Sequence, residues 1–291
     1  MVVRLGWLAF CASSSFVQTA WKFILTHSHH PSGVDHPIFT ESIRRIREAL
    51  TDPGAPASWK QAAQRWPDGP ERDVLERCIH SSGDLAITPD LVIAPPTESR
   101  ADGAQASAAL QGMQALAAGV VILTDTAMAA AAVAPMARRT FGNPVRCLLD
   151  WAPELAPEGD TRSAAAVKAA WAELTAASPS EGSQSSPLAI PPPVVLIGSA
   201  PTALERLLDL VLLPEHALHD PCAPHRLKAP SLVIGMPVGF VGVAESKRRL
   251  AESGLAHIRL EGSKGGAGLV AAACNALLRA AWLQAARLPR I

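Results

Sequence analysis

The chain lacks an excess of charge of either sign, which excludes partners that are held by a strong overall field. Lys plus Arg and Asp plus Glu each number 26 in its 291 residues, so the formal net charge at pH 7 is zero. Nucleic acids and anionic membranes attract proteins through accumulated positive charge. We therefore expect neither nucleic acid nor a membrane as a partner.

Cysteine and aromatic residues are also scarce. The five cysteines are widely spaced and include no CxxC pair, which argues against a disulfide framework and against a zinc ribbon. Tyrosine is absent, which removes one common ring-stacking group. We expect reduced thiols and a cytoplasmic location.

Long apolar runs are missing as well. No stretch approaches the roughly 20 uninterrupted apolar residues that a spanning helix needs. Arg4 and the apolar run Leu5 to Phe10 weakly resemble a signal peptide, but the run is short and is interrupted from Cys11 to Ser15. We expect residues 1–36 to be an extension, poorly ordered or non-native, and residues 37–291 to form a single domain.

What is present, from about residue 90, is a regular alternation of short apolar runs and alanine-rich helical stretches. This alternation predicts an α/β fold with three layers, α/β/α, around a mainly parallel sheet. Insertions rich in Ser, Pro or His, near 178–193 and 214–230, are expected to be surface loops. The predicted strands are Leu91 to Ala94, Val120 to Leu123, Val145 to Leu149, Val194 to Ile197, Leu232 to Ile234 and Ile258 to Leu260.

Two amphipathic helices precede this region, Thr40 to Leu50 and Glu71 to His80, with Gly83 placed to end the second. His80 lies in its last turn. The negative end of the helix dipole and the nearby Asp84 predict a raised pKa for the imidazole, which suits a general acid. The alternative is a histidine that only caps the helix by bonding its last carbonyl groups. Ser42 would share a rim with His80 if the two helices pack together.

Three glycine-bearing turns follow predicted strands: Gly198 to Thr202, Gly235 to Gly242 and Gly262 to Gly268. Glycine lets backbone N–H groups approach an anion, and helix N-termini add partial positive charge. The turns therefore predict a site for carboxylate or phosphate. A nucleotide is the rival ligand, but neither GxxxxGK[ST] nor GxGxxG is present.

Arg162 opens another predicted helix, where a guanidinium suits bidentate recognition of a carboxylate. The alternative is an exposed surface arginine. Neither a metal site nor a Ser-His-Asp hydrolase is expected, because the histidine clusters have no fixed scaffold and no GxSxG sequence is present. Those clusters are His27, His29 and His30, and His216, His219, Cys222 and His225.

Six segments, in order, resemble the motif series of the precorrin-8X methylmutase family, also called cobalt-precorrin-8 methylmutase. The resemblance covers roughly Pro37 to Leu278, and its most specific piece is Pro237 to Lys247. The other segments are Arg77 to Asp84, Leu123 to Met128, Thr161 to Ala165, Gly198 to Leu204 and Lys264 to Leu277.

This resemblance implies a cofactor-free isomerase that moves a methyl group from C11 to C12 of the corrin-forming macrocycle. The product is hydrogenobyrinate or, with cobalt, cobyrinate, and the sequence leaves both open. His80 corresponds to the family's histidine, which protonates a ring nitrogen, and family members are homodimers with the site at the subunit interface. The implied substrate-binding residues are Ser42, Arg77, Thr124, Asp125, Arg162, Ser199, Ala200, Thr202, Gly239, Lys264, Gly265 and Gly266.

The sequence departs from the family at several positions. Ser199 replaces a usual asparagine, Ile43 a usual phenylalanine and Ala267 a usual serine, and the alanines after Met128 replace a usual glycine. These changes keep open a second hypothesis, a tetrapyrrole-binding carrier without catalysis. A third hypothesis is a nucleotide-dependent enzyme that uses the Gly262 to Gly268 turn.

Overall fold

A six-stranded sheet runs through the middle of the computed structural model, which describes residues 35–95, 107–175, 191–212 and 228–287. The strand order is β1-β6-β5-β4-β2-β3. Most strands are short apolar runs that are buried on both faces, as parallel sheets require. Their bounds are β1 Leu91–Ala94, β2 Ile122–Thr124, β3 Val145–Cys147, β4 Val194–Ile197, β5 Leu232–Gly235 and β6 His257–Leu260.

The edge strand β1 is the exception to the parallel arrangement. It pairs with β6 in the antiparallel sense, with Leu91 opposite Leu260, whereas the other neighbouring strands are parallel. The chain therefore enters β1 at the edge of the sheet where the parallel strands end. This brings the segment before β1, including the end of α5 (Pro70–Ser82), to the edge where ligands bind in open α/β sheets.

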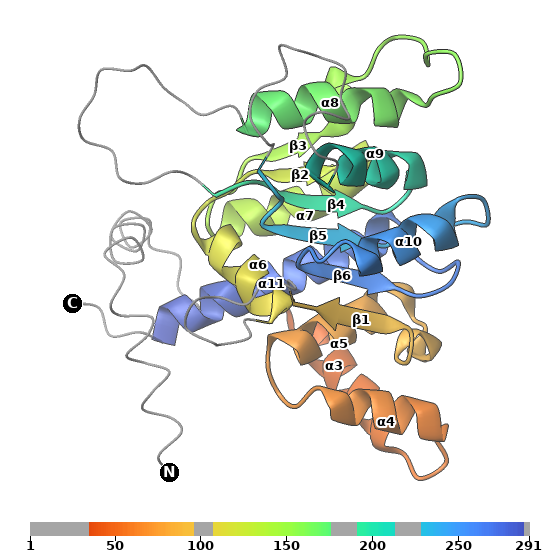
Figure 1. Cartoon of the computed structure of the whole chain (residues 1–291). Helices are drawn as coiled ribbons and strands as arrows, with labels where there is room; N and C mark the ends of the chain where they lie inside the picture. The colour runs from red at the N-terminus through yellow and green to blue at the C-terminus, as the bar shows by residue number, and fades with distance from the viewer. Residues whose placement is uncertain (1–34, 96–106, 176–190, 213–227, 288–291) are drawn as a thin grey trace.

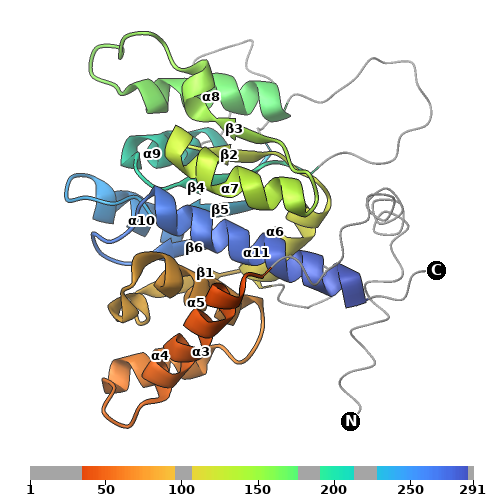
Figure 2. The same ribbon diagram turned by 180° about the vertical axis from the view of Figure 1, so that it is seen from behind.

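Helices cover both faces of the sheet (Figures 1 and 2), so the predicted α/β/α architecture is confirmed. Alternate residues of β4 point to opposite cores: Leu196 lies in one apolar cluster and Val195 in the other. One face carries α3 Pro37–Thr51, α4 Ala57–Arg65, α5, α6 Ala108–Ala117, α7 Ala127–Arg139 and α11 Ala267–Arg287. The other carries α8 Arg162–Thr175, α9 Pro201–Leu212 and α10 Val243–Glu252.

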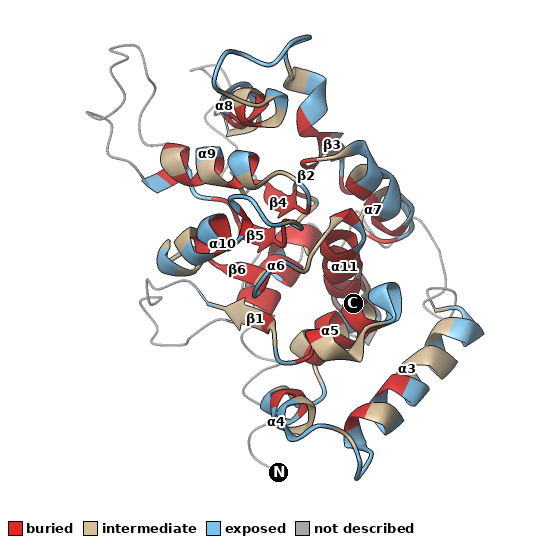
Figure 3. Ribbon diagram, turned by 90° about the vertical axis from the view of Figure 1, so that its right-hand side faces the viewer, coloured by how far each residue is buried: buried red, intermediate tan, exposed pale blue. Residues whose placement is uncertain are grey.

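The long helix α11 is the centre of the first face. Figure 3 shows it surrounded by other elements, in contrast to α3, which presents only a narrow buried stripe formed by Ile46 and Leu50. Within the described residues, α11 alone is long and apolar enough to cross a membrane, but 67% of its apolar window is buried inside the protein. That burial fits a core helix.

Several predicted boundaries need correction. The strand predicted to reach Leu149 ends at Cys147 and continues as a 3-10 turn, η3 (Leu148–Trp151), where the Asp150 carboxylate accepts a hydrogen bond from the Cys147 amide. Helix α4 was not predicted because its sequence is mostly polar and buries only two alanines. Another 3-10 turn, η2 (Leu85–Ile87), leads into β1.

The extension and the insertions fall mainly outside the described residues, and so do both histidine clusters. The last two residues of the expected extension, Asp35 and His36, contact the domain. The His36 ring accepts a hydrogen bond from the Ile38 amide at the start of α3, and the Asp35 carboxylate pairs with Arg279 of α11.

Candidate functional site

His80 stands at the carboxyl edge of the sheet because α5 ends there. Gly83 adopts a left-handed conformation (φ 68°), and its N–H donates to the Ile79 carbonyl at 2.8 Å, which closes the helix as predicted. The His80 ring does not bond the helix end. Its Nδ1 lies 2.7 Å from the Ser42 hydroxyl oxygen of α3, so the predicted packing of the two early helices is confirmed.

An aromatic ring and two guanidinium groups flank this pair. The Phe39 ring meets the His80 ring edge-on, with centroids 5.2 Å apart. Arg77 lies over Phe39 at 4.6 Å and Arg279 at 5.7 Å, both within cation–π range. Arg77 is the charge that acts on His80, whereas Arg279 is paired with Asp35 and Asp73.

The expected rise in the pKa of His80 is wrong: its pKa is lowered from the usual 6.5. Partial burial is the main cause and the neighbouring Arg77 charge is the second. Asp84, which was expected to favour the imidazolium, instead pairs with Lys264 at 2.9 Å, and that contact lowers the pKa of Asp84. His80 is thus mainly neutral at pH 7 and a stronger acid once protonated.

The turn between β6 and α11 contacts the end of α5 at the carboxyl edge of the sheet. Lys264 reaches Asp84, four residues after His80, and the Ser81 hydroxyl donates to the Gly268 carbonyl at 3.4 Å. Gly265 packs so closely that an added Cβ would lie 2.0 Å from the Met236 carbonyl oxygen. The structure therefore brings the turn that carries Lys264, Gly265 and Gly266 against the end of α5, the helix that carries His80.

The amide groups of the glycine turns have acceptors inside the protein. Gly266 N–H donates to the Met236 carbonyl and Gly239 N–H to the Ser263 carbonyl. One oxygen of Asp125 accepts from the amides of Gly198, Ser199 and Ala200, at 3.0, 2.6 and 2.9 Å. These particular amides join the turns to one another and to the end of β2, so they are already engaged inside the protein.

Asp125 itself is buried at the end of β2, and burial raises its pKa. Its second carboxylate oxygen has no partner among the described residues. The neighbouring Thr124 is also buried and donates its hydroxyl to the Thr126 carbonyl. Both residues hold the edge together and offer little surface to a ligand.

Arg162 and Thr202 lie further along the edge. The Thr202 hydroxyl is 2.7 Å from that of Thr161, which joins the starts of α8 and α9. Arg162 is exposed and its Nε donates to the Pro153 carbonyl at 2.8 Å. Because α8 covers the opposite face of the sheet near β3, whereas α5 lies near β1, Arg162 is remote from His80 within one chain (Figure 1).

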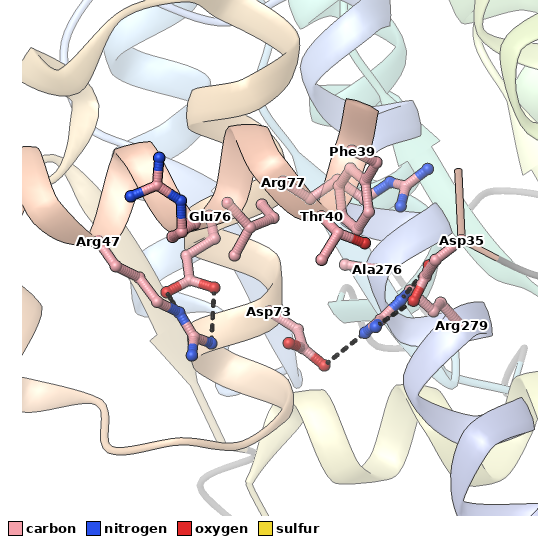
Figure 4. A pocket seen from close by; sticks show the side chains of 11 residues that line it. Asp35, Phe39, Thr40, Arg47, Asp73, Glu76, Arg77, Ala276 and Arg279 are labelled. Carbon is pink, nitrogen blue, oxygen red and sulfur yellow. Dashed lines mark hydrogen bonds and ion pairs between the residues drawn. The ribbon is translucent and has the colours of Figure 1, made fainter. Parts of the chain in front are cut away.

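A pocket of about 320 Å³ opens between α3, α5 and α11 (Figure 4). Its wall carries ion pairs: Arg47 contacts Glu76 through two hydrogen bonds of 2.8 and 3.0 Å, and Arg279 contacts Asp35 and Asp73. Phe39 and Arg77 form the side towards His80, which itself lies outside the lining. This volume is at the lower end for ligand pockets.

Sequence reasoning did not single out Phe39, Glu76 and Arg279, which line this pocket. Phe39 stands three residues before Ser42 on the same helix, and that i, i+3 spacing places the two side chains near each other. Arg279 lies far from the other residues in sequence, so its position required the packing of α11 on α5. No group of His, Cys, Asp and Glu that could hold a metal occurs in the part of the chain that the structure describes, and three free cysteines there are buried.

The fold and this edge define an α/β protein whose candidate site combines a histidine with several cationic side chains. Residues 37–280 match the family described as precorrin-8X methylmutase. The chain is 37% identical to "Precorrin-8X methylmutase" of Pseudomonas aeruginosa over 82% of this chain and 93% of that protein. It is 31% identical to "Cobalt-precorrin-8 methylmutase" of Synechocystis sp., over 86% and 97% respectively.

The precorrin-8X methylmutase crystal structure from Thermus thermophilus has the same fold, with a TM-score of 0.58 and 30% identity, over 85% of this chain and 97% of that one. The chain belongs to the precorrin-8X methylmutase family. It is accordingly an isomerase of cobalamin biosynthesis, and the hypotheses of a non-catalytic carrier and of a nucleotide-dependent enzyme receive no support.

Proposed function

We propose that this chain moves a methyl group from C11 to C12 of precorrin-8X or cobalt-precorrin-8, with His80 as the proton donor. The single observation that carries the proposal is the contact of His80 Nδ1 with Ser42. That contact holds the ring through Nδ1 and leaves Nε2, which has no partner among the described residues, for the substrate.

In this mechanism protonated His80 donates its proton to a ring nitrogen of the macrocycle. The π system becomes electron-poor, the C11–methyl bond breaks as the C12–methyl bond forms, and the nitrogen returns its proton. Atoms and electrons balance without an oxidant or a cofactor. The lowered pKa of His80 makes the imidazolium a stronger acid, and the substrate's carboxylates would favour the protonated ring in the complex.

We propose that Ser42, Arg77 and Lys264 contact the substrate around His80, whereas Asp125 and Thr124 hold the turns in place. Arg77 has no carboxylate partner among the described residues, so it suits a peripheral carboxylate of the ring system. Gly265 and Gly266 let the backbone approach the macrocycle closely. Gly239, Ser199, Ala200 and Thr202 line the same edge.

We further propose a cytoplasmic homodimer in which Arg162 of one chain serves the site of the other. Two observations support it: Arg162 is remote from His80 within one chain, and large apolar side chains stand exposed on the edge. Phe240 is 94% and Val241 88% exposed. A contiguous exposed apolar patch is typical of an interface or a ligand surface.

The test is conversion of precorrin-8X and of cobalt-precorrin-8, followed by absorbance, for the wild type and for His80→Ala. We expect the variant to lose at least about a hundredfold in kcat, as general acids do, while it still binds the macrocycle. Conversion of one substrate and not the other would decide whether cobalt is required. Undiminished turnover by His80→Ala would disprove the proposed role.

A further inference from the structure

Lys247 is a fully buried lysine at the carboxyl edge of the sheet. It lies on α10, and only 1% of the residue is exposed. Its ammonium donates to the Gly262 and Lys264 carbonyls, each at 2.7 Å. A buried charge is costly unless it is compensated, and an apolar side chain of similar length would fill the same space without that cost. We therefore look for the role of the charge in the hydrogen bonds that the ammonium donates, and not in the packing of the side chain.

The two carbonyl groups belong to the turn that contacts the end of α5, the helix that carries His80. This turn carries the Lys264 side chain to Asp84, at the end of α5, and continues into Gly265, whose backbone lies against Met236. Carbonyl groups in a turn have no regular secondary-structure partner, so a single donor that bonds two of them fixes the turn's path. The position of Lys264 relative to α5 depends on that path.

We propose that Lys247 is a positioning residue, which holds the Gly262 to Gly266 turn against the end of α5 and so sets the place of His80. The inference rests on the proposed function in one respect only, namely that the position of His80 matters for turnover. The claim that Lys247 holds the turn in place depends only on the contacts of the turn, whatever the function of His80.

The charge on Lys247 is sensitive to pH. Burial lowers its pKa to about 8, although the carboxylates of Glu261 and Asp90 oppose this effect; the side chain of Lys264 is the other charged group of the turn. Above that pH the amine becomes neutral and its hydrogen bonds to the carbonyl oxygens weaken. The environment of His80 should then change at a pH well above its own titration.

The experiment follows the His80 ring by NMR as the pH is raised, in the full chain without substrate. We expect the main step below pH 6.5, from His80 itself, and a smaller second step near pH 8 from Lys247. The second step should vanish in Lys247→Met and in Lys247→Arg, because neither side chain titrates there. A second step that persists in both variants, or that is absent from the wild type, would overturn the proposal.

Turnover near pH 7 gives an independent measurement. Lys247→Met should lower kcat by about 10- to 100-fold, since a small displacement of a catalytic group has effects of that size, and KM should rise because Lys264 moves with the turn. Lys247→Arg should recover much of the loss. Arg249→Met is the matched control on the same helix, because Arg249 pairs with Glu205 and Asp209 of α9, away from the turn, and should leave kcat unchanged.

The outcomes separate the two proposals. A wild type that converts neither macrocycle refutes the proposed function, while the NMR titration still tests Lys247. A wild type that is active, with Lys247→Met equally active, refutes the role of Lys247 alone. If Lys247→Met fails to fold, the wild-type titration and Lys247→Arg give the answer.

Discussion

His80 is supported from two sides, and the two supports differ in kind. The turn before α11 is held by buried groups, namely the Lys247 ammonium and the close approach of Gly265 to Met236. Helix α3 is held by a thin apolar stripe and by an ion pair in which the Arg47 side chain is 46% exposed. The turn before α11 therefore has almost no room to move. Helix α3 can shift more easily, so Ser42 is the more mobile partner of His80.

The largest loss of stability is expected from Gly265→Ala, which alters the turn before α11, the rigid support of His80. The new Cβ would lie 2.0 Å from the Met236 carbonyl oxygen, and a backbone atom cannot move aside as a side-chain end can. Overpacking of this kind should cost about 3 kcal/mol or more in the free energy of unfolding, measured with denaturant.

Gly268→Ala is the matched control for that change. Its added Cβ would make only ordinary contact with Ser81, at 3.8 Å, and the residue is helical. It should be neutral or stabilising by up to about 1 kcal/mol. Equal stability of the two variants would show that the turn is not the rigid support.

A smaller effect is expected from Glu76→Gln, which weakens the α3 side. The Glu76 side chain is 2% exposed and accepts hydrogen bonds from Arg47 and Arg72, so the loss of its charge leaves two cations poorly compensated. We expect a loss of about 2 kcal/mol in stability, with faster hydrogen exchange in α3 than in α11.

Glu41→Gln serves as the comparison for Glu76→Gln. Its ion pairs with Arg44 and Arg45 lie on the surface, where such pairs contribute little, so the stability of this variant should equal that of the wild type. Uniform hydrogen exchange across α3 and α11 in Glu76→Gln would contradict the difference between the two supports.

The sequence predicts the layers, the parallel strands and the position of His80 because each follows from local periodicity or from a helix end. It does not predict that β1 is antiparallel, since the apolar run Leu91–Ala94 reads the same in either direction. That reversal is what places α5 at the carboxyl edge. The pKa of His80 was mispredicted for a related reason: its burial, which is the main cause of the lowering, depends on the packing of α3 on α5, with the Arg77 charge second. The expected influence of Asp84 is absent because Asp84 pairs with Lys264 from a distant turn.

The glycine turns show the same limit. Their composition indicates close backbone approach, and Gly265 and Gly198 do approach other backbone atoms closely. The acceptors of their amides come from elsewhere in the chain: Asp125, after a different strand, accepts from the Gly198 turn, and the Met236 carbonyl accepts from Gly266. Residue spacing therefore identifies the edge that carries the site, while tertiary contacts decide which groups on it stay available to a ligand.

The pH dependence of kcat/KM and of kcat for the wild type tests the role of His80 most directly. Because the acid acts in its protonated form and its pKa in the free protein is below 6.5, kcat/KM should fall as the pH rises through that lower range. The corresponding fall in kcat should lie at higher pH, since bound carboxylates favour the imidazolium. A kcat/KM that is flat, or that rises with pH over this range, would contradict His80 as the acid.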